Sequence, residues 1–400
     1  MAATAALVLG AFLPLPAQAP PGPAAQVDVD TGRLQRDLDA LLQQRSAALL
    51  RHDEAGFLRS VDPAAPEEFR QRQAALFRNL AEVPLSTWDY DVEQIPGGEP
   101  THPRVSLNYR IAGVDAVPAR RPVDYGFAWR EGRWFLTDDT TARRAPWDFG
   151  PCRVVRTAHG VIIGHDGTRE LSGRLAREVD SAVDAVTRVW GPWRREVGVL
   201  LPQSRDELSA LVGAEFAVDG IAAVTVADKV DVGAKRVEGP RVVINTDTAD
   251  RLSDTSLRVV LRHEIAHVAA RADTAESAPM WLLEGFADYV GYRESGLRPE
   301  RIAPDLGEQI RAGRLPDGPP GDSEFHRSGR RLDVAYQESW SLVDHLVRRI
   351  GEPRMVQLYR RIAGTGGADV VDPALREIAG IGLGDLVREW RAELQQRYAR

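Results

Sequence analysis

The feature that most constrains the fold is a pair of histidines one helical turn apart, in an apolar segment that begins near Ser253 and Asp254. His263 and His267 are separated by four positions. On an α-helix this spacing places both imidazoles on one face, where they can share a metal ion. Glu264 directly follows the first histidine, so its carboxylate would project toward a water molecule on that metal. The sequence therefore predicts a helix that supplies two metal ligands and a general base.

A second helix is predicted to complete this site. A catalytic zinc site needs a third protein ligand, and Glu284 lies in the apolar segment 281–289, after a loop at 271–279 that lets the chain turn back. Asp288 follows one helical turn later, where its carboxylate can accept the free N–H of a ligating imidazole and fix its tautomer. We predict one Zn²⁺ per chain, held by the two histidines and Glu284, although cobalt or manganese can occupy such ligand sets.

The two motifs together resemble a known family. His-Glu-Ile-Ala-His at 263–267 and Trp-Leu-Leu-Glu-Gly-Phe-Ala-Asp-Tyr at 281–289 look like the gluzincin metallopeptidases of the thermolysin-like superfamily, and most closely their small peptidase-MA-like members. The resemblance covers about residues 155–398. The roles that it implies are zinc ligands at His263, His267 and Glu284, a general base at Glu264, and a residue behind the ligands at Asp288.

The reaction implied by this resemblance is hydrolysis of a peptide bond. Zinc with three protein ligands keeps one position open, lowers the pKa of a bound water toward neutrality and polarises the scissile carbonyl. Glu264 would take the proton of this water and pass it to the leaving amine. The oxyanion needs a donor besides zinc, and the candidates by position are Tyr336, then His326 and His345. Packing against the helix that follows is the alternative role for Tyr336.

Two other interpretations of these residues are open. The same side chains could hold zinc structurally in a non-catalytic binding protein, although a structural site usually closes its fourth position with protein and has no use for Glu264. The N-terminal half could also be an interaction module, with the C-terminal half as its scaffold. Bound zinc without peptide cleavage would favour the first of these, and full function after loss of zinc would favour the second.

The predicted fold class is α+β, with two domains after the N-terminal segment. Residues 30–148 combine helices with antiparallel strands at 85–95, 104–114, 123–130 and 133–137. This pattern resembles the curled sheet of the cone-shaped NTF2-like domain, and we interpret the unit as an accessory domain. Residues 152–400 are predicted as the gluzincin-like metallopeptidase domain, with a small mixed sheet, the active-site helix and a helical C-terminal subdomain.

Within the second domain, strands and helices are predicted from apolar periodicity. The strands are expected at 153–164, 197–201, 222–227 and 241–245, and the helices at 168–190 and 205–212. We interpret residues 241–245 as a sheet-edge strand. In the resembled family such an edge binds the peptide substrate as an added strand, although pairing and packing alone would also produce an apolar strand here.

Composition restricts the partners of the chain. Its 400 residues carry 51 basic and 58 acidic side chains, for a net charge of −7. No basic excess is available to neutralise a phosphate backbone, so a nucleic acid partner is not expected. The expected partner is a peptide or protein substrate. The single cysteine, Cys152, excludes an intramolecular disulfide and a cysteine-based zinc site, and is expected to be a buried thiol.

Residues 1–29 are predicted to be a signal peptide and linker. The apolar run from Met1 ends at Ala17-Gln18-Ala19, which is typical of a secretory signal with a small-residue cleavage site. The basic segment that usually precedes such a run is missing, since Arg33 is the first Lys or Arg. We expect an exported protein, extracellular or in the cell envelope. Contact with a membrane is expected only through this segment, if it stays uncleaved.

Overall fold

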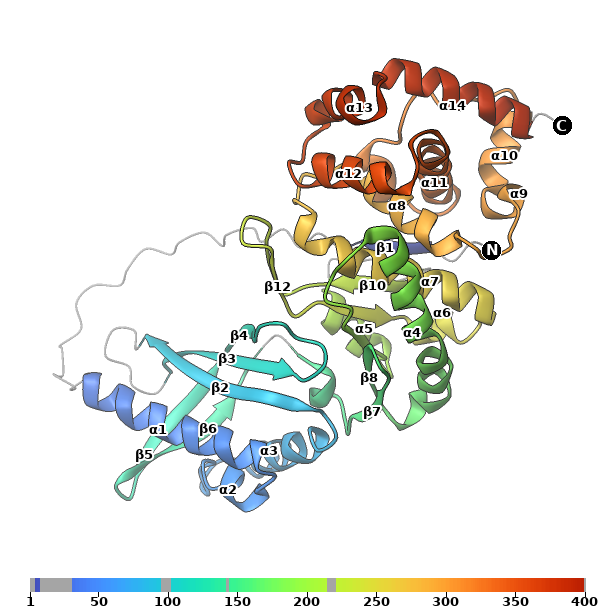
Figure 1. The fold of residues 1–400 in the computed structure, drawn as a ribbon. Helices are drawn as coiled ribbons and strands as arrows, with labels where there is room; N and C mark the ends of the chain where they lie inside the picture. Colours follow the sequence, from blue (N-terminus) through green and yellow to red (C-terminus); the bar gives the residue numbers. More distant parts are fainter. Residues whose placement is uncertain (1–3, 8–30, 95–101, 142–143, 214–220, 399–400) are drawn as a thin grey trace.

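The computed structural model describes residues 4–7, 31–94, 102–141, 144–213 and 221–398, so most of the predicted signal peptide and linker lies outside the described residues. The chain is α+β, as predicted. A unit of helices and strands comes first, followed by a larger sheet and a group of helices that ends the chain (Figure 1). Among the described helices, none combines the length and the apolar character that a membrane span needs.

The N-terminal unit contains three helices and two small antiparallel sheets. Its elements are α1 (Thr31–Leu50), α2 (Glu54–Leu58), α3 (Glu67–Asn79), β2 (Leu85–Gln94), β3 (Arg104–Ile111), β4 (Ala119–Val123), β5 (Tyr125–Arg130) and β6 (Arg133–Asp139). Strands β2, β3 and β4 form one sheet, while β5 and β6 form a separate hairpin. The strand predicted at 123–130 corresponds to β5 but begins too early, and β4 was not predicted.

The break in that strand lies at Asp124, where the chain passes from one sheet to the other. The backbone N–H of Asp124 donates to Thr141 Oγ1 at 3.0 Å instead of joining a sheet ladder. Strand β4 pairs with β3, whereas β5 pairs with β6. The alternating apolar residues continue across this change of partner strand, so periodicity cannot show where one strand ends and the next begins. The likeness of this unit to the NTF2-like cone stays a prediction.

The second unit is built on a six-stranded mixed sheet. Its strands, in spatial order, are β1 (Thr4–Leu7), β10 (Ile221–Val226), β13 (Arg241–Ile244), β9 (Val197–Leu200), β8 (Gly160–Gly164) and β7 (Arg153–Arg156). Strands β13, β9 and β8 are parallel to one another, whereas β10 and β7 run antiparallel to their inner neighbours. A short hairpin of β11 (Lys229–Asp231) and β12 (Arg236–Glu238) lies between β10 and β13 in the sequence.

Two strand predictions in this unit are wrong. Residues 153–164 form two strands, because a turn between them is held by α4 (Arg169–Trp190), from which Asp180 accepts the N–H groups of Ala158 at 3.1 Å and His159 at 2.9 Å. Residues 241–245 do not form the sheet edge, since β13 pairs with β10 on one side and β9 on the other. Every residue of β13 is buried, as expected for an interior strand covered on both faces.

The six-stranded sheet separates two hydrophobic cores. Side chains of successive strand residues point to opposite faces, and the two faces contribute to different apolar clusters. On one face the strands pack with α4 and the C-terminal helices, through Ile162, Val199, Ala222, Val242 and Ile244. On the other face they pack with the N-terminal unit, through Val161, Ile163, Leu200, Val224 and Val243. The N-terminal unit thus covers one side of the sheet.

Helix α5 (Arg205–Val212) packs on the side of the N-terminal unit, through Leu208 and Val212. The remaining helices contribute to the core on the opposite side of the sheet and end the chain (Figure 1). They are α6 (Thr246–Ala249), α7 (Asp254–Ala270), α8 (Met280–Tyr292), α9 (Pro299–Ile302), α10 (Pro304–Arg311), α11 (Arg330–Ile350), α12 (Glu352–Ala363), α13 (Val371–Ala379) and α14 (Leu383–Tyr398). Helix α7 packs against α4, α8 and β10, and α8 packs in turn against α11. The Ser253 side chain caps α7 by accepting the N–H of Ser256 at 3.1 Å, a role in which serine is common at helix N-termini.

A buried ion pair joins the two units. Arg241, the first residue of β13, donates through Nη1 to Asp115 Oδ1 at 2.6 Å and through Nη2 to Asp115 Oδ2 at 2.9 Å. Asp115 lies in the loop between β3 and β4 and also accepts the N–H of Ile111 at 2.7 Å. Both charged groups are buried. The domain boundary near residues 148–152 stays a prediction, because the two units share the Arg241–Asp115 ion pair and one apolar core.

Candidate metal centre

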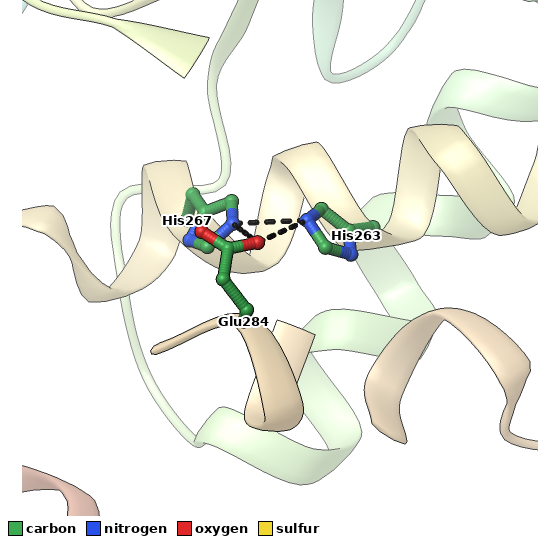
Figure 2. Close-up of side chains that lie close together, drawn as sticks. All are labelled: His263, His267 and Glu284. Atoms are coloured by element: carbon green, nitrogen blue, oxygen red, sulfur yellow. Dashed lines mark hydrogen bonds and ion pairs between the residues drawn. The ribbon is translucent and has the colours of Figure 1, made fainter. Parts of the chain in front are cut away.

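Helices α7 and α8 bring three metal-ligating side chains to one point. His263 Nε2 lies 3.0 Å from His267 Nε2. Glu284 Oε2 lies 3.3 Å from His263 Nε2 and 3.6 Å from His267 Nε2. Figure 2 shows the two imidazoles on one face of α7 and the carboxylate reaching them from α8. The three residues predicted as ligands therefore converge in space.

The arrangement fits a zinc ion. Zinc binds imidazole and carboxylate at about 2.1 Å in tetrahedral geometry, which separates the ligand atoms by roughly 3.4 Å. The observed separations of 3.0 to 3.6 Å bracket this value. Two imidazole nitrogens and a carboxylate oxygen aimed at one point are a donor set that zinc prefers. Among the described residues, this is the group of His, Cys, Asp and Glu side chains that could hold a metal ion.

Burial and charge prepare the three side chains for a cation. His263 is 1% exposed, His267 3% and Glu284 0%. Burial by itself raises the pKa of Glu284, but the two neighbouring histidines outweigh it and lower this pKa to about 2. The carboxylate therefore stays ionised over the pH range in which proteins usually operate. A buried anion of this kind is costly unless a positive partner compensates it.

Asp288 lies behind the first ligand. It follows Glu284 by one turn of α8, and its Oδ1 is 2.8 Å from His263 Nδ1. Accepting the Nδ1–H leaves the lone pair of Nε2 pointed at the ligand cluster, which is the tautomer that a metal needs. The structure thus places the predicted pair of Asp288 and His263 in direct contact.

Glu264 lies beside the cluster and is completely buried. Its Oε2 accepts a hydrogen bond from Thr225 Oγ1 at 2.6 Å, and the same hydroxyl lies 3.1 Å from the Glu264 backbone oxygen. Its Oε1 is buried and makes no hydrogen bond with the described residues. Burial raises the pKa of Glu264, while the two histidines and Thr225 act in the opposite direction. A carboxylate with one fixed oxygen and one open oxygen is suited to accept a proton.

Thr225 is the site residue that sequence reasoning missed. It lies on β10, where the sequence reads Ile-Ala-Ala-Val-Thr-Val, and only 2% of its side chain surface is exposed. The contact joins a strand and a helix that are far apart in sequence, so neither motif indicates it. The available signal is the single hydroxyl in an otherwise apolar strand, since a buried hydroxyl requires a hydrogen-bond partner.

Of the three candidates for an oxyanion donor, the structure brings Tyr336 to the centre. Tyr336 lies on α11, is buried, and lies near the carboxylates of Glu284, Asp288 and Glu264. Burial, followed by the nearby carboxylates, raises its pKa well above the ordinary value. His326 lies on an exposed turn. His345 faces α14 instead, with its Nδ1 2.6 Å from Glu393 Oε2.

The fold and the site together define a class: an α+β protein with a buried His-His-Glu centre and an adjacent carboxylate. Comparison with known proteins finds one family model that matches part of the chain. Residues 197–314 match the family model named BSP and described as "Peptidase of plants and bacteria". The matched segment begins with β9 and ends beyond α10, so it includes Thr225, both motifs and Asp288, while Tyr336 lies outside it. The match supports a peptidase-like protein, and no curated protein sequence matches the chain significantly.

Solved structures similar to this chain include a zinc metallopeptidase and a hydrolase. A mutant of the M1 zinc metallopeptidase from Deinococcus radiodurans is 16% identical, with 67% of this chain and 59% of that chain covered and a TM-score of 0.35. Native LTA4 hydrolase from yeast is 13% identical, with 76% of this chain and 51% of that chain covered and a TM-score of 0.36. This chain therefore spans less than two thirds of the length of either structure.

Proposed function

We propose that the protein is a zinc-dependent peptidase that hydrolyses peptide bonds in a peptide or protein substrate. The observation that carries this proposal is the convergence of His263, His267 and Glu284 beside a buried carboxylate with one open oxygen. The family match over residues 197–314 supports the same class of activity. The gluzincin relationship and the residue roles below belong to the proposal.

The two histidines and Glu284 would hold the ion. When bound, zinc activates a water molecule as a nucleophile and polarises the scissile carbonyl. The chain contributes the proton transfers. Glu264 Oε1 accepts a proton from the attacking water and then delivers it to the leaving amine, which is general base followed by general acid catalysis. Asp288 keeps His263 in the ligating tautomer through its 2.8 Å contact.

Thr225 positions the base. Its hydroxyl donates to Glu264 Oε2 at 2.6 Å, which restricts rotation of the carboxylate and leaves Oε1 as the oxygen that can accept a proton. A hydrogen bond to a charged group contributes about 1.5 to 3 kcal/mol. The strand β10 therefore does more than pack against α7, because it fixes the orientation of the group that moves the proton.

Tyr336 is the proposed donor to the oxyanion. Its hydroxyl lies near the Glu284 carboxylate, and its raised pKa keeps it protonated at neutral pH, so that it can donate. Preorganised donors of this kind stabilise the charge that develops in the transition state. The phenol would then hold the carbonyl oxygen while Glu264 handles the proton.

The main rival is a non-catalytic zinc-binding protein with the same ligands. Such a protein would gain nothing from Glu264, because a buried carboxylate oxygen without a partner is costly and a structural centre usually closes its fourth position with protein. In a peptidase, this Oε1 would accept the proton of the attacking water. This difference favours catalysis over a structural role.

The test compares wild-type protein with Glu264→Gln, a change that keeps the side-chain volume and the hydrogen bond from Thr225 but removes the base. Metal content is measured together with cleavage of a quenched mixed-peptide library. We expect one zinc per chain in both proteins and cleavage by the wild type alone. His263→Ala serves as a second variant and should lose both zinc and cleavage.

Two results would contradict the proposal in different ways. Zinc in both proteins without cleavage by either would favour the binding protein, and absence of bound zinc from the wild type would reject the centre itself.

We also propose that residues 1–19 direct export. Recovery of the intact N-terminus from the cytoplasm of an exporting host, with no protein outside, would reject this second proposal.

A further inference from the structure

A groove on the N-terminal unit is lined by residues of elements that lie away from α7 and α8 in Figure 1. It has a volume of about 710 Å³ and is bordered by α1, by α2 with the residues that follow it, and by the β5–β6 hairpin. The proposed peptidase mechanism uses none of its residues. Its lining is unusual in charge and in exposed aromatic surface, and both properties point to a ligand.

The charge of the groove is opposite to that of the protein. Five arginines and a single acid, Asp37, line it, in a chain whose net charge is −7. The arginines are Arg33, Arg45, Arg51, Arg59 and Arg133. Like charges gathered in one concave surface repel one another, and a groove of one sign raises the local concentration of ligands of the other sign.

The nearby carboxylates compensate little of this charge. Arg33 and Arg59 reach Asp37 and Asp53 at 3.9 and 3.5 Å, in exposed pairs, which contribute little in water. Within the described part of the chain, Arg51 and Arg133 form no ion pair. Both residues are exposed, and the Arg133 guanidinium carbon lies 4.2 Å from the centre of the Phe135 ring, so both charges are accessible to an incoming anion.

Arg45 adds a buried positive charge to the wall of the groove. It is 0% exposed. Its Nη1 donates to Ser60 Oγ at 2.9 Å, its Nη2 donates to Gln73 Oε1, and its guanidinium carbon lies 3.6 Å from the centre of the Phe57 ring. These partners are neutral, and no described carboxylate forms an ion pair with Arg45. A buried charge without an opposite charge is disfavoured, and an anion in the groove would relieve this.

The aromatic surface lies on the hairpin. Trp129 is 50% exposed, which is unusual for so large an apolar side chain. It packs edge to face against Trp134, with ring centroids 5.6 Å apart. Tryptophan and arginine are the residues that most often anchor a partner at protein interfaces. Exposed tryptophan beside exposed arginine therefore suits a ligand that carries both apolar groups and negative charges.

We propose that this groove binds an acidic peptide segment in which carboxylates alternate with apolar side chains. Arginine binds carboxylates in a two-pronged geometry, and the tryptophan pair offers a surface for the apolar side chains between them. A nucleic acid is disfavoured because its continuous negative charge would extend over the rest of an acidic protein. The binding does not depend on peptidase activity, so it can be tested in a chain without the proposed base.

The experiment uses the full chain carrying Glu264→Gln, titrated by calorimetry with a short peptide of alternating Glu and Leu. The groove variant adds Arg51→Glu and Arg133→Glu, which replace exposed side chains that form no ion pair with another described residue. Trp129→Ala tests the aromatic surface. Arg251→Glu is the matched control, because it is an exposed arginine on the other unit. Unfolding midpoints establish that each variant is folded.

We expect the acidic peptide to bind, more weakly at high salt, and at least about tenfold more weakly to the groove variant and to Trp129→Ala. Arg251→Glu should bind like its parent. The proposal is overturned if the acidic peptide does not bind, or if Arg251→Glu weakens its binding as much as the groove variant does. It is also overturned if a peptide of alternating Lys and Leu binds equally well, or if a single-stranded oligonucleotide binds more tightly. None of these results depends on whether the wild type cleaves peptides.

Discussion

The carboxylate of Asp288 meets His263 Nδ1 at 2.8 Å, one helical turn beyond Glu284 on the same helix. A single short helix thus supplies one predicted metal ligand and the group that orients another. The two functions are linked geometrically, because any rotation of α8 about its axis would move both carboxylates together. The α7–α8 pair therefore behaves as one unit of the proposed centre.

Replacing Asp288 with Asn should weaken zinc binding. The amide can present its NH₂ group or its oxygen, so it holds the ligating tautomer of His263 less firmly than a carboxylate does. Loss of such a partner typically costs about 10-fold to 100-fold in metal affinity. Competition against a chromogenic chelator measures the affinity. An unchanged zinc affinity would show that His263 does not depend on this contact.

Replacing Thr225 with Val should lower kcat with little change in KM. The substitution keeps the shape of the side chain and removes only the hydrogen bond to Glu264 Oε2. From the usual strength of a hydrogen bond to a charged group, we expect a loss of roughly tenfold to hundredfold. Thr225→Ser keeps the hydroxyl and should recover most of the rate. If serine is as impaired as valine, the methyl group and packing, rather than the hydroxyl, are responsible.

Replacing Tyr336 with Phe tests the oxyanion donor. Loss of one such donor typically costs about 10²-fold to 10³-fold in kcat, whereas removal of a hydroxyl from a tyrosine that only packs should leave the rate nearly unchanged. Steady-state kinetics on a peptide substrate distinguish the two. His345→Gln is the control, because His345 contacts Glu393 rather than the centre, and it should retain activity.

Breaking the Arg241–Asp115 pair should destabilise the whole protein. Asp115→Asn leaves a buried guanidinium without its anion, and removal of one partner from a buried pair usually costs about 3 to 5 kcal/mol. Denaturant unfolding measures the change. Combining Asp115→Asn with Arg241→Met should recover part of the stability, because the uncompensated charge is then gone. A loss below about 1 kcal/mol for the single variant would mean that water reaches this contact.

A second buried pair, His165 and Glu207, predicts a pH dependence. His165 Nε2 lies 2.9 Å from Glu207 Oε1. Burial acts to lower the pKa of His165, but Glu207 outweighs it, so the folded-state pKa is raised above 6.5. The folded state therefore binds the proton more tightly than the unfolded state. The resulting stabilisation is fully present below pH 6.5 and is lost as the pH rises through the folded-state pKa.

The measurement is the difference in unfolding free energy between wild type and Glu207→Gln as a function of pH. This difference should shrink as the pH rises above about 6.5. Other titrating groups are common to both proteins and largely cancel in the difference. A difference that grows over this range would mean that the histidine is neutral in the folded protein and that the pair has another role.

The local parts of the candidate centre were predictable from the sequence. The spacing of His263 and His267, and of Glu284 and Asp288, is set by the pitch of one helix in each case, so residue numbers alone place each pair on a face. The convergence of the two helices was inferred from the chemistry that three ligands require. The helix at 168–190 and the helix at 205–212 were also predicted nearly to their ends, because apolar periodicity and caps are local signals.

What the sequence could not provide depends on contacts between distant segments. Thr225 meets Glu264 across 39 positions, and the turn at Ala158 exists because Asp180 reaches it from a helix. The order of strands in the sheet also depends on contacts between segments that are distant in the sequence. An apolar strand such as β13 has the same sequence pattern at the edge of a sheet and in its interior. The strands that pair with it determine which position it takes.

The sheet that separates the two apolar cores also limits how the chain can be shortened. A recombinant fragment that starts at residue 152 would keep both metal-binding helices but remove the N-terminal unit from one face of the sheet, where Val161, Leu200 and Val243 lie. Exposed apolar surface promotes aggregation. Truncation trials aimed at a minimal catalytic fragment should therefore retain the N-terminal unit, or replace the apolar residues of that face with polar ones.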